Sequence, residues 1–94
     1  MANVYAFPKP NSKRPNSRIN MRFPDGSQHI VRYAYNDRVD LWSIEIDGSR
    51  KFVAVGVDLL RDLRIDYSLI VIADTDPDLA GFDSGAATLA LIGE

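Results

Sequence analysis

The sequence offers few side chains that could act on a substrate, and the first is His29, the single histidine among 94 residues. A histidine becomes a general base when a carboxylate orients it and a nucleophile faces it. The sequence places no such pair beside His29, which follows Gln28 at the start of a strand-like segment after a polar turn. We therefore expect His29 at the surface or the rim of the fold, predict no catalytic residue, and do not expect an enzyme.

Three aspartates, Asp74, Asp76 and Asp78, have the alternate spacing with which a calcium-binding loop begins. The rest of such a loop is missing. Leu79 stands where the sharp turn needs glycine, and Gly85 stands where a bidentate glutamate should close the site. We expect an acidic surface loop that could meet a basic surface on a partner, with a weak cation site as the open alternative. No metal and no cofactor are predicted.

The chain has no cysteine, which excludes disulfides, thiolate metal sites and thiol nucleophiles. Small secreted domains are usually stapled by disulfides, so an origin in the cytoplasm is favoured. The first ten residues, MANVYAFPKP, lack the apolar stretch of a signal peptide. The longest apolar run, residues 69–73, is far short of a membrane span.

The elements that must position these residues are short strands, because apolar and polar residues alternate between turn signals. We predict an all-β domain: a small antiparallel β-sandwich or barrel of about six strands, with one short helical connector and an extended N-terminal arm. The predicted strands are residues 19–23, 28–35, 41–46, 51–57, 67–73 and 86–92.

Three segments carry the most specific structural predictions. In residues 41–46, Trp42, Ile44 and Ile46 share one face, as in a half-buried antiparallel strand. Residues 67–73 are almost continuously apolar, which predicts a central strand. Residues 58–66 are leucine-rich but too short for an independent helix, so we predict a connector with a helical turn.

A basic segment precedes an acidic body. Residues 1–18 hold four basic side chains and no acid (+4), whereas residues 19–94 hold seven basic and thirteen acidic side chains (−6). Three prolines between residues 8 and 15 exclude a helix or a central strand. We therefore divide the chain into an extended basic N-terminal arm, residues 1–18, and a single β domain, residues 19–94. Val4, Tyr5 and Phe7 either dock on a neighbouring subunit or cover the domain's own core.

Short motifs between Arg32 and Leu91 carry a resemblance to a known family. In chain order they are Arg32-Tyr33-Ala34-Tyr35-Asn36, Trp42-Ser43-Ile44-Glu45-Ile46-Asp47, Val55-Gly56-Val57-Asp58-Leu59, Ile70-Val71-Ile72-Ala73-Asp74 with Asp76-Pro77, and Phe82-Asp83-Ser84-Gly85. In this order and spacing the chain resembles the baseplate plug family of contractile-tailed bacteriophages.

The resemblance implies a structural component of the phage tail baseplate, a plug or adaptor on the tail axis that bridges the tail tube and the central hub and spike. Its partners would be those tail proteins and further copies of itself in a ring, as a trimer or hexamer. It would be made in the host cytoplasm and reside in the virion, with no membrane partner. The candidate interface residues are Val4, Tyr5, Phe7, Arg14, Arg18, Tyr33, Tyr35, Trp42, Asp74, Asp76 and Asp78.

A second hypothesis is a small β-barrel module that binds single-stranded nucleic acid or a small ligand. Tyr33 and Tyr35 with Arg32 would form the stacking face that such modules use. The acidic body and the scarcity of lysine in the strands argue against nucleic acid.

Overall fold

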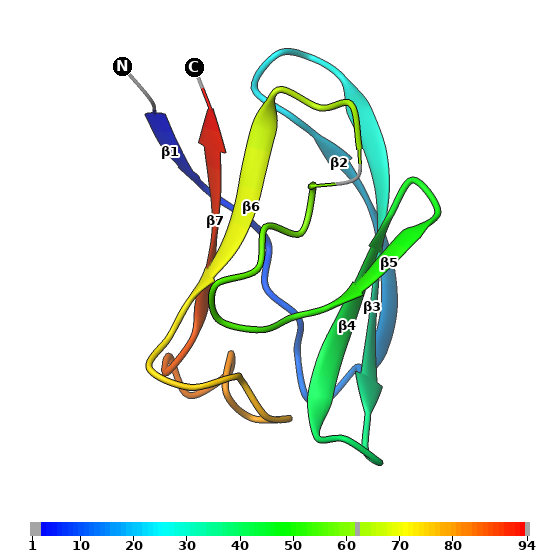
Figure 1. Ribbon diagram of the computed structural model, residues 1–94. Helices are drawn as coiled ribbons and strands as arrows, with labels where there is room; N and C mark the ends of the chain where they lie inside the picture. The colour runs from blue at the N-terminus through cyan, green and yellow to red at the C-terminus, as the bar shows by residue number, and fades with distance from the viewer. Residues whose placement is uncertain (1–2, 62, 94) are drawn as a thin grey trace.

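The computed structural model describes residues 3–61 and 63–93, and it shows two antiparallel β-sheets packed face to face (Figure 1). The smaller sheet has the order β1-β7-β6 and the larger the order β2-β3-β4-β5. The predicted all-β class is confirmed. The strands are β1 (Asn3–Ala6), β2 (Asn16–Arg22), β3 (Gln28–Asn36), β4 (Leu41–Ile46), β5 (Ser49–Phe52), β6 (Tyr67–Ile72) and β7 (Thr88–Gly93).

Tight turns join the strands of the larger sheet and fix their register. Between β4 and β5, Asp47 (φ 52°) and Gly48 (φ 86°) both have positive φ, and Ile46 pairs with Ser49 across them. An Asp-Gly pair with positive φ at both positions makes the two-residue turn whose twist suits a hairpin. This register places Trp42, Ile44 and Ile46 on the inner face of β4, as their alternation predicts.

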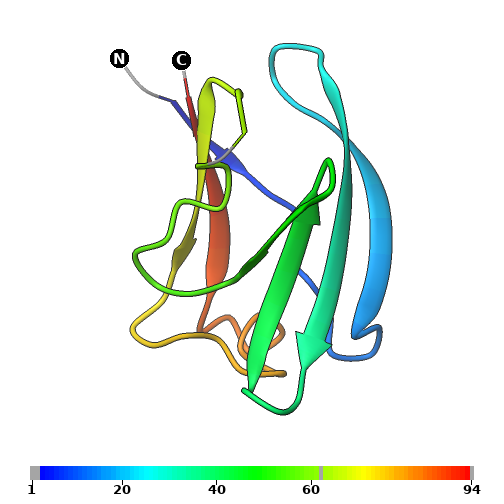
Figure 2. The same ribbon diagram turned by 45° about the vertical axis from the view of Figure 1, so that its right-hand side comes forward.

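The core lies between the two sheets and is rich in large side chains (Figure 2). Trp42 is fully buried and makes edge contacts with Tyr35 and Phe82, at ring-centroid distances of 5.3 and 6.4 Å. Its indole nitrogen also donates to the Asp78 carbonyl at 2.9 Å, which ties the 73–87 loop to β4. The other fully buried large side chains are Phe23, Val31, Ile44, Ile46, Val53, Leu59, Leu60, Leu69, Phe82 and Leu91.

The predicted helical connector at residues 58–66 is not a helix in its described part. The Asp58 carboxylate accepts hydrogen bonds from the Leu60 amide (3.0 Å) and from the Leu69 amide in β6 (3.1 Å). The Leu59 amide donates to the Leu69 carbonyl at 2.8 Å. These bonds hold the segment against β6 as turns, and Leu59 and Leu60 are both buried. The bonds from Asp58 and Leu59 to Leu69 hold the segment along β6, which is the physical reason that it forms turns instead of a helix.

The apolar segment at residues 67–73 is an edge strand rather than the predicted central one. Among the described strands β6 pairs with β7 alone, and its other edge is covered in part by the bonds from residues 58 and 59 to Leu69. Its inward residues Leu69 and Val71 are buried, but Ile72 is 54% exposed. A continuous apolar run normally indicates burial on both faces. In this chain the inner face of β6 is buried, and its outer face, which includes Ile72, is not covered.

Residues 3–18, predicted as an extended arm, are extended and take part in the sandwich, while residues 1 and 2 lie outside the described residues. β1 pairs along its length with β7, and β2 already begins at Asn16. Phe7 is only 6% exposed and stacks edge-on against Phe23 at 6.3 Å. The Lys9 ammonium donates to the Phe82 carbonyl at 3.0 Å. The sequence alone leaves two alternatives for this segment, docking on a neighbouring subunit or covering the domain's own core. Phe7 covers the core.

Several strand ends differ from the predictions. β5 ends at Phe52 instead of residue 57, because residues 54–57 form a turn in which Gly56 has a φ of 85°. β2 begins three residues before residue 19, and β7 runs over Thr88–Gly93 instead of residues 86–92.

Candidate functional site

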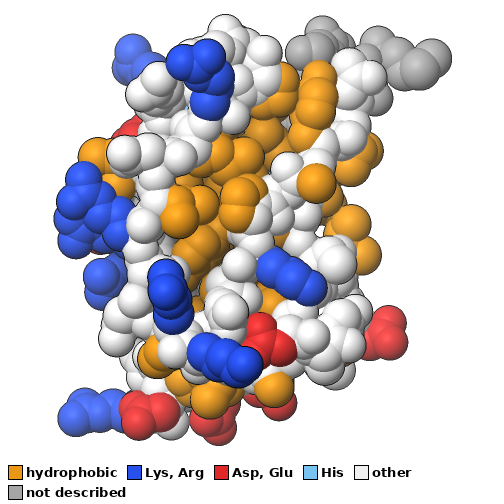
Figure 3. Space-filling view, turned by 180° about the vertical axis from the view of Figure 1, so that it is seen from behind, with side chains coloured by type: hydrophobic (Ala, Val, Ile, Leu, Met, Phe, Trp, Pro, Cys, Tyr) orange, Lys and Arg blue, Asp and Glu red, His pale blue; other side chains and the backbone are white. Residues whose placement is uncertain are grey.

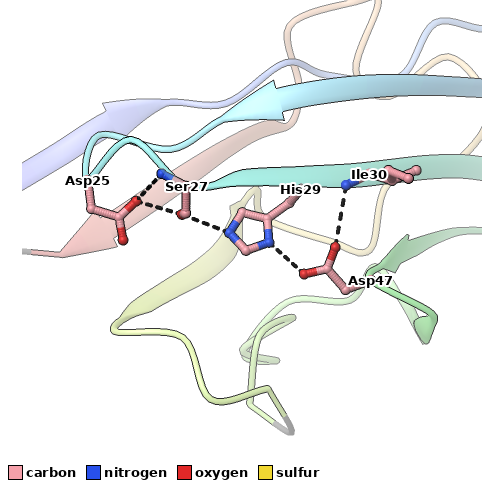
Figure 4. Close-up of polar contacts among 5 residues, drawn as sticks. All are labelled: Asp25, Ser27, His29, Ile30 and Asp47. Carbon is pink, nitrogen blue, oxygen red and sulfur yellow. Dashed lines mark hydrogen bonds and ion pairs between the residues drawn. The ribbon is translucent and has the colours of Figure 1, made fainter.

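His29 lies in a chain of polar side chains that joins two hairpin turns (Figure 4). Its Nδ1 is 2.5 Å from Asp47 Oδ2, and its Nε2 is 2.9 Å from Ser27 Oγ. The imidazole is 12% exposed and packs against Phe23 at a ring-centroid distance of 4.2 Å. A carboxylate does orient His29, contrary to the sequence analysis. The contact depends on the β3–β4 register, which brings the turn at Asp47 beside His29.

Ser27, His29 and Asp47 are connected in the order of a Ser-His-Asp triad, but their hydrogen bonds favour a structural role, in which they hold the two turns together. We call these three side chains the clamp at His29. Ser27 Oγ is also 2.6 Å from Asp25 Oδ1, and the Ser27 amide donates to the same oxygen at 2.9 Å. These two bonds from Ser27 hold the pKa of the Asp25 carboxyl below its usual range. If Ser27 donates its hydroxyl proton to Asp25, His29 Nε2 must be the donor to Ser27. His29 Nε2 then has no lone pair with which to accept the serine proton, as a general base facing Ser27 must.

The outer face of the β1-β7-β6 sheet is the most unusual surface of the molecule. The register places side chains of alternate residues outward, and none of these outward residues in the described strands is charged. Val4 is 69% and Ile72 is 54% exposed. Outward faces of antiparallel sheets are normally polar. We call this surface the aliphatic face; its residues are Val4, Ala6, Ser68, Ile70, Ile72, Thr88, Ala90 and Ile92.

The outer face of the larger sheet has the opposite chemistry. One row of cross-strand neighbours runs over all four strands as Arg18, Arg32, Glu45 and Arg50. The Glu45 carboxylate lies 3.8 Å from each of the Arg32 and Arg50 guanidinium groups. The row therefore has three positive charges and one negative charge. We call the surface around it the arginine face, and Figure 3 shows lysine and arginine side chains gathered along one border of the molecule.

Figure 3 also shows hydrophobic side chains in a seam between the two sheets. The sandwich is open there because the edge strands β1 and β2 belong to different sheets and do not pair. Tyr5 of β1 and Ile19 and Met21 of β2 point inward but stay partly exposed. Tyr5 contacts Tyr67 edge-on at 6.5 Å.

The three predicted aromatic interface residues of β3 and β4 point into the core. Tyr33 is 3% exposed and its hydroxyl donates to the Pro8 carbonyl, and burial raises its pKa well above the usual range. Tyr35 donates its hydroxyl to Asp40 at 3.1 Å, and Trp42 is fully buried. Arg32 points to the opposite side of the sheet. The predicted stacking face of Arg32, Tyr33 and Tyr35 is therefore not formed.

The acidic residues 74, 76 and 78 lie on one exposed loop, but each has its own surroundings. Asp76 Oδ1 accepts a hydrogen bond from the Val55 amide at 2.8 Å, so this carboxylate holds the turn after β5. Asp74 and Asp78 are exposed. Within residues 3–61 and 63–93, no group of three or more His, Asp or Glu side chains is arranged to hold a metal ion. Of the two predicted basic contacts, Arg18 lies on the arginine face and Arg14 in an exposed turn bridged to Asn11.

Comparison with known proteins gives no relative: no family model and no curated protein matches the chain. In the described part of the chain, no helix has the length and apolar character needed to cross a membrane.

Proposed function

We propose that this chain is a structural subunit that works by packing against neighbouring proteins, and specifically that it is a plug or adaptor of a contractile phage tail baseplate. In that role it bridges the tail tube and the central hub and spike, and it acts on no substrate. The motifs between Arg32 and Leu91 support the specific assembly. The aliphatic face supports the general role and is the observation that carries it.

The aliphatic face supports packing because exposure of apolar side chains such as Val4 and Ile72 is costly in water. Each Å² of apolar surface covered is worth about 25 cal/mol. Val4, Ile70, Ile72 and Ile92 are contributed by all three strands of one sheet, so they form a continuous patch rather than scattered positions. Continuous apolar patches on soluble domains are characteristic of interaction sites.

The open strand edges support the same role. β1 and β6 are the edges of the smaller sheet, and β2 and β5 those of the larger sheet. Free edges present unpaired backbone groups, and monomeric proteins usually protect them with charges, bulges or short strands. β6 carries Ile70 and Ile72 outward and has no charged residue over its length. An uncharged edge strand of this kind suits burial against another subunit.

The test is incorporation into particles. Contractile tails are purified from cells that carry the gene, and their proteins are identified by mass spectrometry. We expect the wild-type chain in the tails, and we expect the folded double variant Val4→Lys/Ile72→Lys to be missing, since two ammonium groups would be buried at the interface. Val39→Lys is the matched control, because Val39 is 50% exposed and lies outside the aliphatic face.

Two results would contradict the proposal. One is absence of the wild-type chain from purified tails. The other is incorporation of the Val4→Lys/Ile72→Lys variant at the wild-type level, which would separate the aliphatic face from the function. Circular dichroism of each purified variant establishes that it is folded.

The alternative role, a binding module for single-stranded nucleic acid or a small ligand, is supported only by the arginine face. The buried Tyr33 cannot stack on a base. Nucleic-acid binding would therefore have to rest on Arg18, Arg32 and Arg50. An electrophoretic shift of an oligonucleotide that disappears with Arg32→Ala would favour this alternative, and no shift at moderate salt would remove it.

A further inference from the structure

The row across the arginine face holds three arginines and one glutamate, so the row itself has an excess of positive charge. Arg18 stands directly opposite Arg32 in the β2–β3 register, and like charges directly opposite each other destabilise a sheet. Glu45 is the one carboxylate of the row, and it is shared between Arg32 and Arg50 at 3.8 Å. Those two arginine side chains are 56% and 64% exposed. This arrangement would be stabilised by further carboxylates from outside.

The row borders a hollow with an apolar side chain. In the adjacent row Ala34, Ser43 and Phe52 are cross-strand neighbours. Phe52 is 47% exposed, whereas the small Ser43 at the bottom of the hollow is only 7% exposed. Arg50, Arg38 and Asp37 also line this hollow, so two guanidinium groups and one carboxylate border it. A complementary partner would bring an apolar side chain to Phe52 with carboxylates on either side.

One segment of the same chain has that composition. Residues 74–83, DTDPDLAGFD, contain four aspartates and no basic residue. Leu79 is 39% exposed and directly follows the exposed Asp78. The indole bond from Trp42 to the Asp78 carbonyl fixes the backbone beside Leu79. The loop therefore presents an apolar side chain next to a carboxylate from a held backbone.

We propose that the arginine face of one copy binds the 74–83 loop of a second copy, head to tail. The exposed carboxylates Asp74 and Asp78 would meet the guanidinium row, and Leu79 would enter the hollow beside Phe52. Because the two surfaces are different, each copy can bind two others, and such heterologous contacts generate rings or filaments. This inference rests on the proposed function, in which copies surround the tail axis, and it names the surfaces that join them.

The composition of the face favours a protein partner over nucleic acid. Its cations on the described strands β2–β5 are all arginines, namely Arg18, Arg22, Arg32 and Arg50, because Lys51 belongs to the other side of β5. Arginine and phenylalanine are enriched at protein interfaces, whereas lysine is depleted there. The body beyond residue 18 is also net acidic, which opposes a polyanion.

The test is a charge swap between the two surfaces. Three purified chains are compared with the wild type by analytical ultracentrifugation over a range of concentrations at low salt. They are Arg18→Glu/Arg50→Glu, Asp74→Lys/Asp78→Lys, and a matched control, Arg64→Glu, at an exposed position outside the larger sheet. Asp76 is kept because it holds the Val55 amide.

We expect the wild type and the control to self-associate, and each reversed chain alone to do so at least about tenfold more weakly, since like charges would then face each other. An equimolar mixture of the two reversed chains should associate again, because each reversed surface meets its complement on the other chain. Recovery in the mixture cannot come from misfolded proteins.

A wild type that is monomeric at every concentration would overturn the inference, as would a mixture that fails to recover. Loss of oligonucleotide binding in Arg18→Glu/Arg50→Glu, with no self-association of the wild type, would assign the face to nucleic acid instead. Failure here leaves the proposed function intact if the chain is still found in purified tails, because a neighbour other than itself would then cover the arginine face.

Discussion

The two sheets of this sandwich share one core but present opposite chemistry to the outside. The β1-β7-β6 sheet is aliphatic and uncharged on its outer face, and the β2-β3-β4-β5 sheet carries the row of Arg18, Arg32, Glu45 and Arg50. Inward residues decide whether the chain folds, whereas outward residues of an antiparallel sheet are free to vary. Two outer faces this different are consistent with the two contacts proposed above, one apolar and one with acidic side chains.

The largest loss of stability is expected when the segment that follows β1 loses its contact with the core. Phe7→Ala removes a 6%-exposed ring that follows β1 and packs on Phe23. We expect a loss of about 3–5 kcal/mol in the free energy of unfolding, because a buried phenylalanine is replaced by a cavity. Denaturant unfolding followed by tryptophan fluorescence measures it.

Val4→Ala is the matched control, since Val4 lies on the same segment but is 69% exposed. It should change the free energy of unfolding by less than about 0.5 kcal/mol. Equal effects of Phe7→Ala and Val4→Ala would show that residues 3–7 do not belong to the fold as described.

A smaller effect is expected beneath the arginine face. Tyr33→Phe removes the hydroxyl that donates to the Pro8 carbonyl and leaves that acceptor without its partner. We expect a loss of about 0.5–1.5 kcal/mol in the free energy of unfolding, the usual net contribution of one hydrogen bond. An unchanged denaturation midpoint would mean that the Tyr33 bond to the segment before β2 contributes nothing.

The pKa of Tyr33 gives this contact a pH dependence. Burial raises that pKa, so the folded state retains the hydroxyl proton at a pH where the unfolded state has lost it. Its contribution to stability is complete below the unfolded pKa of about 10 and declines as pH rises above that value. An absorbance titration should show one tyrosine that ionises only when the protein unfolds. Ionisation of all four tyrosines in the folded protein at their usual pH would contradict this.

The smallest effect is expected at the exposed contact between Ser12 and Asp83. Hydrogen bonds from the hydroxyl and amide of Ser12 hold the pKa of the Asp83 carboxyl below its usual range. This contribution is present above the ordinary carboxyl pKa and is lost as pH falls below it. Asp83→Asn should therefore slightly reduce the acid dependence of the melting temperature and leave the alkaline limb unchanged. A change in the melting temperature at alkaline pH would mean that the effect does not come from the Asp83 carboxyl.

Local signals in the sequence were sufficient for most of the larger sheet. Alternation predicted the inward set Trp42, Ile44 and Ile46, and the turn between the predicted strands 41–46 and 51–57 is present at Asp47-Gly48. These predictions succeeded because each depends on residues that are close in sequence.

The errors have a different origin, because they depend on contacts between distant segments. β1 pairs with β7 at the other end of the chain, so residues 3–6 gave no local sign of being a strand. Asp58 bonds to Leu69 in β6, which holds residues 58–61 as turns rather than a helix. The clamp at His29 depends on Asp47, which lies 18 residues further along the chain, after β4. Only the register of the folded sheets brings these groups together.

The misplaced central strand is the most informative error. The apolar run of β6 predicted cover on both faces, yet within this chain only its inner face is covered. The other half of the apolar run, the outward residues Ile70 and Ile72, lies on the aliphatic face. Burial of β6 on both faces would require a neighbouring subunit that covers Ile70 and Ile72, and β6 would still be an edge strand.

The central claim, that another protein covers the aliphatic face, is tested most directly by site-specific photo-crosslinking in purified tails. A photoreactive amino acid replaces Ile72 on the aliphatic face or, as a control, Val39 in the exposed β3–β4 turn. We predict that position 72 crosslinks to another polypeptide in the particle and that the control does not. A chain that is present in the tails but gives no crosslink from position 72 would contradict the account.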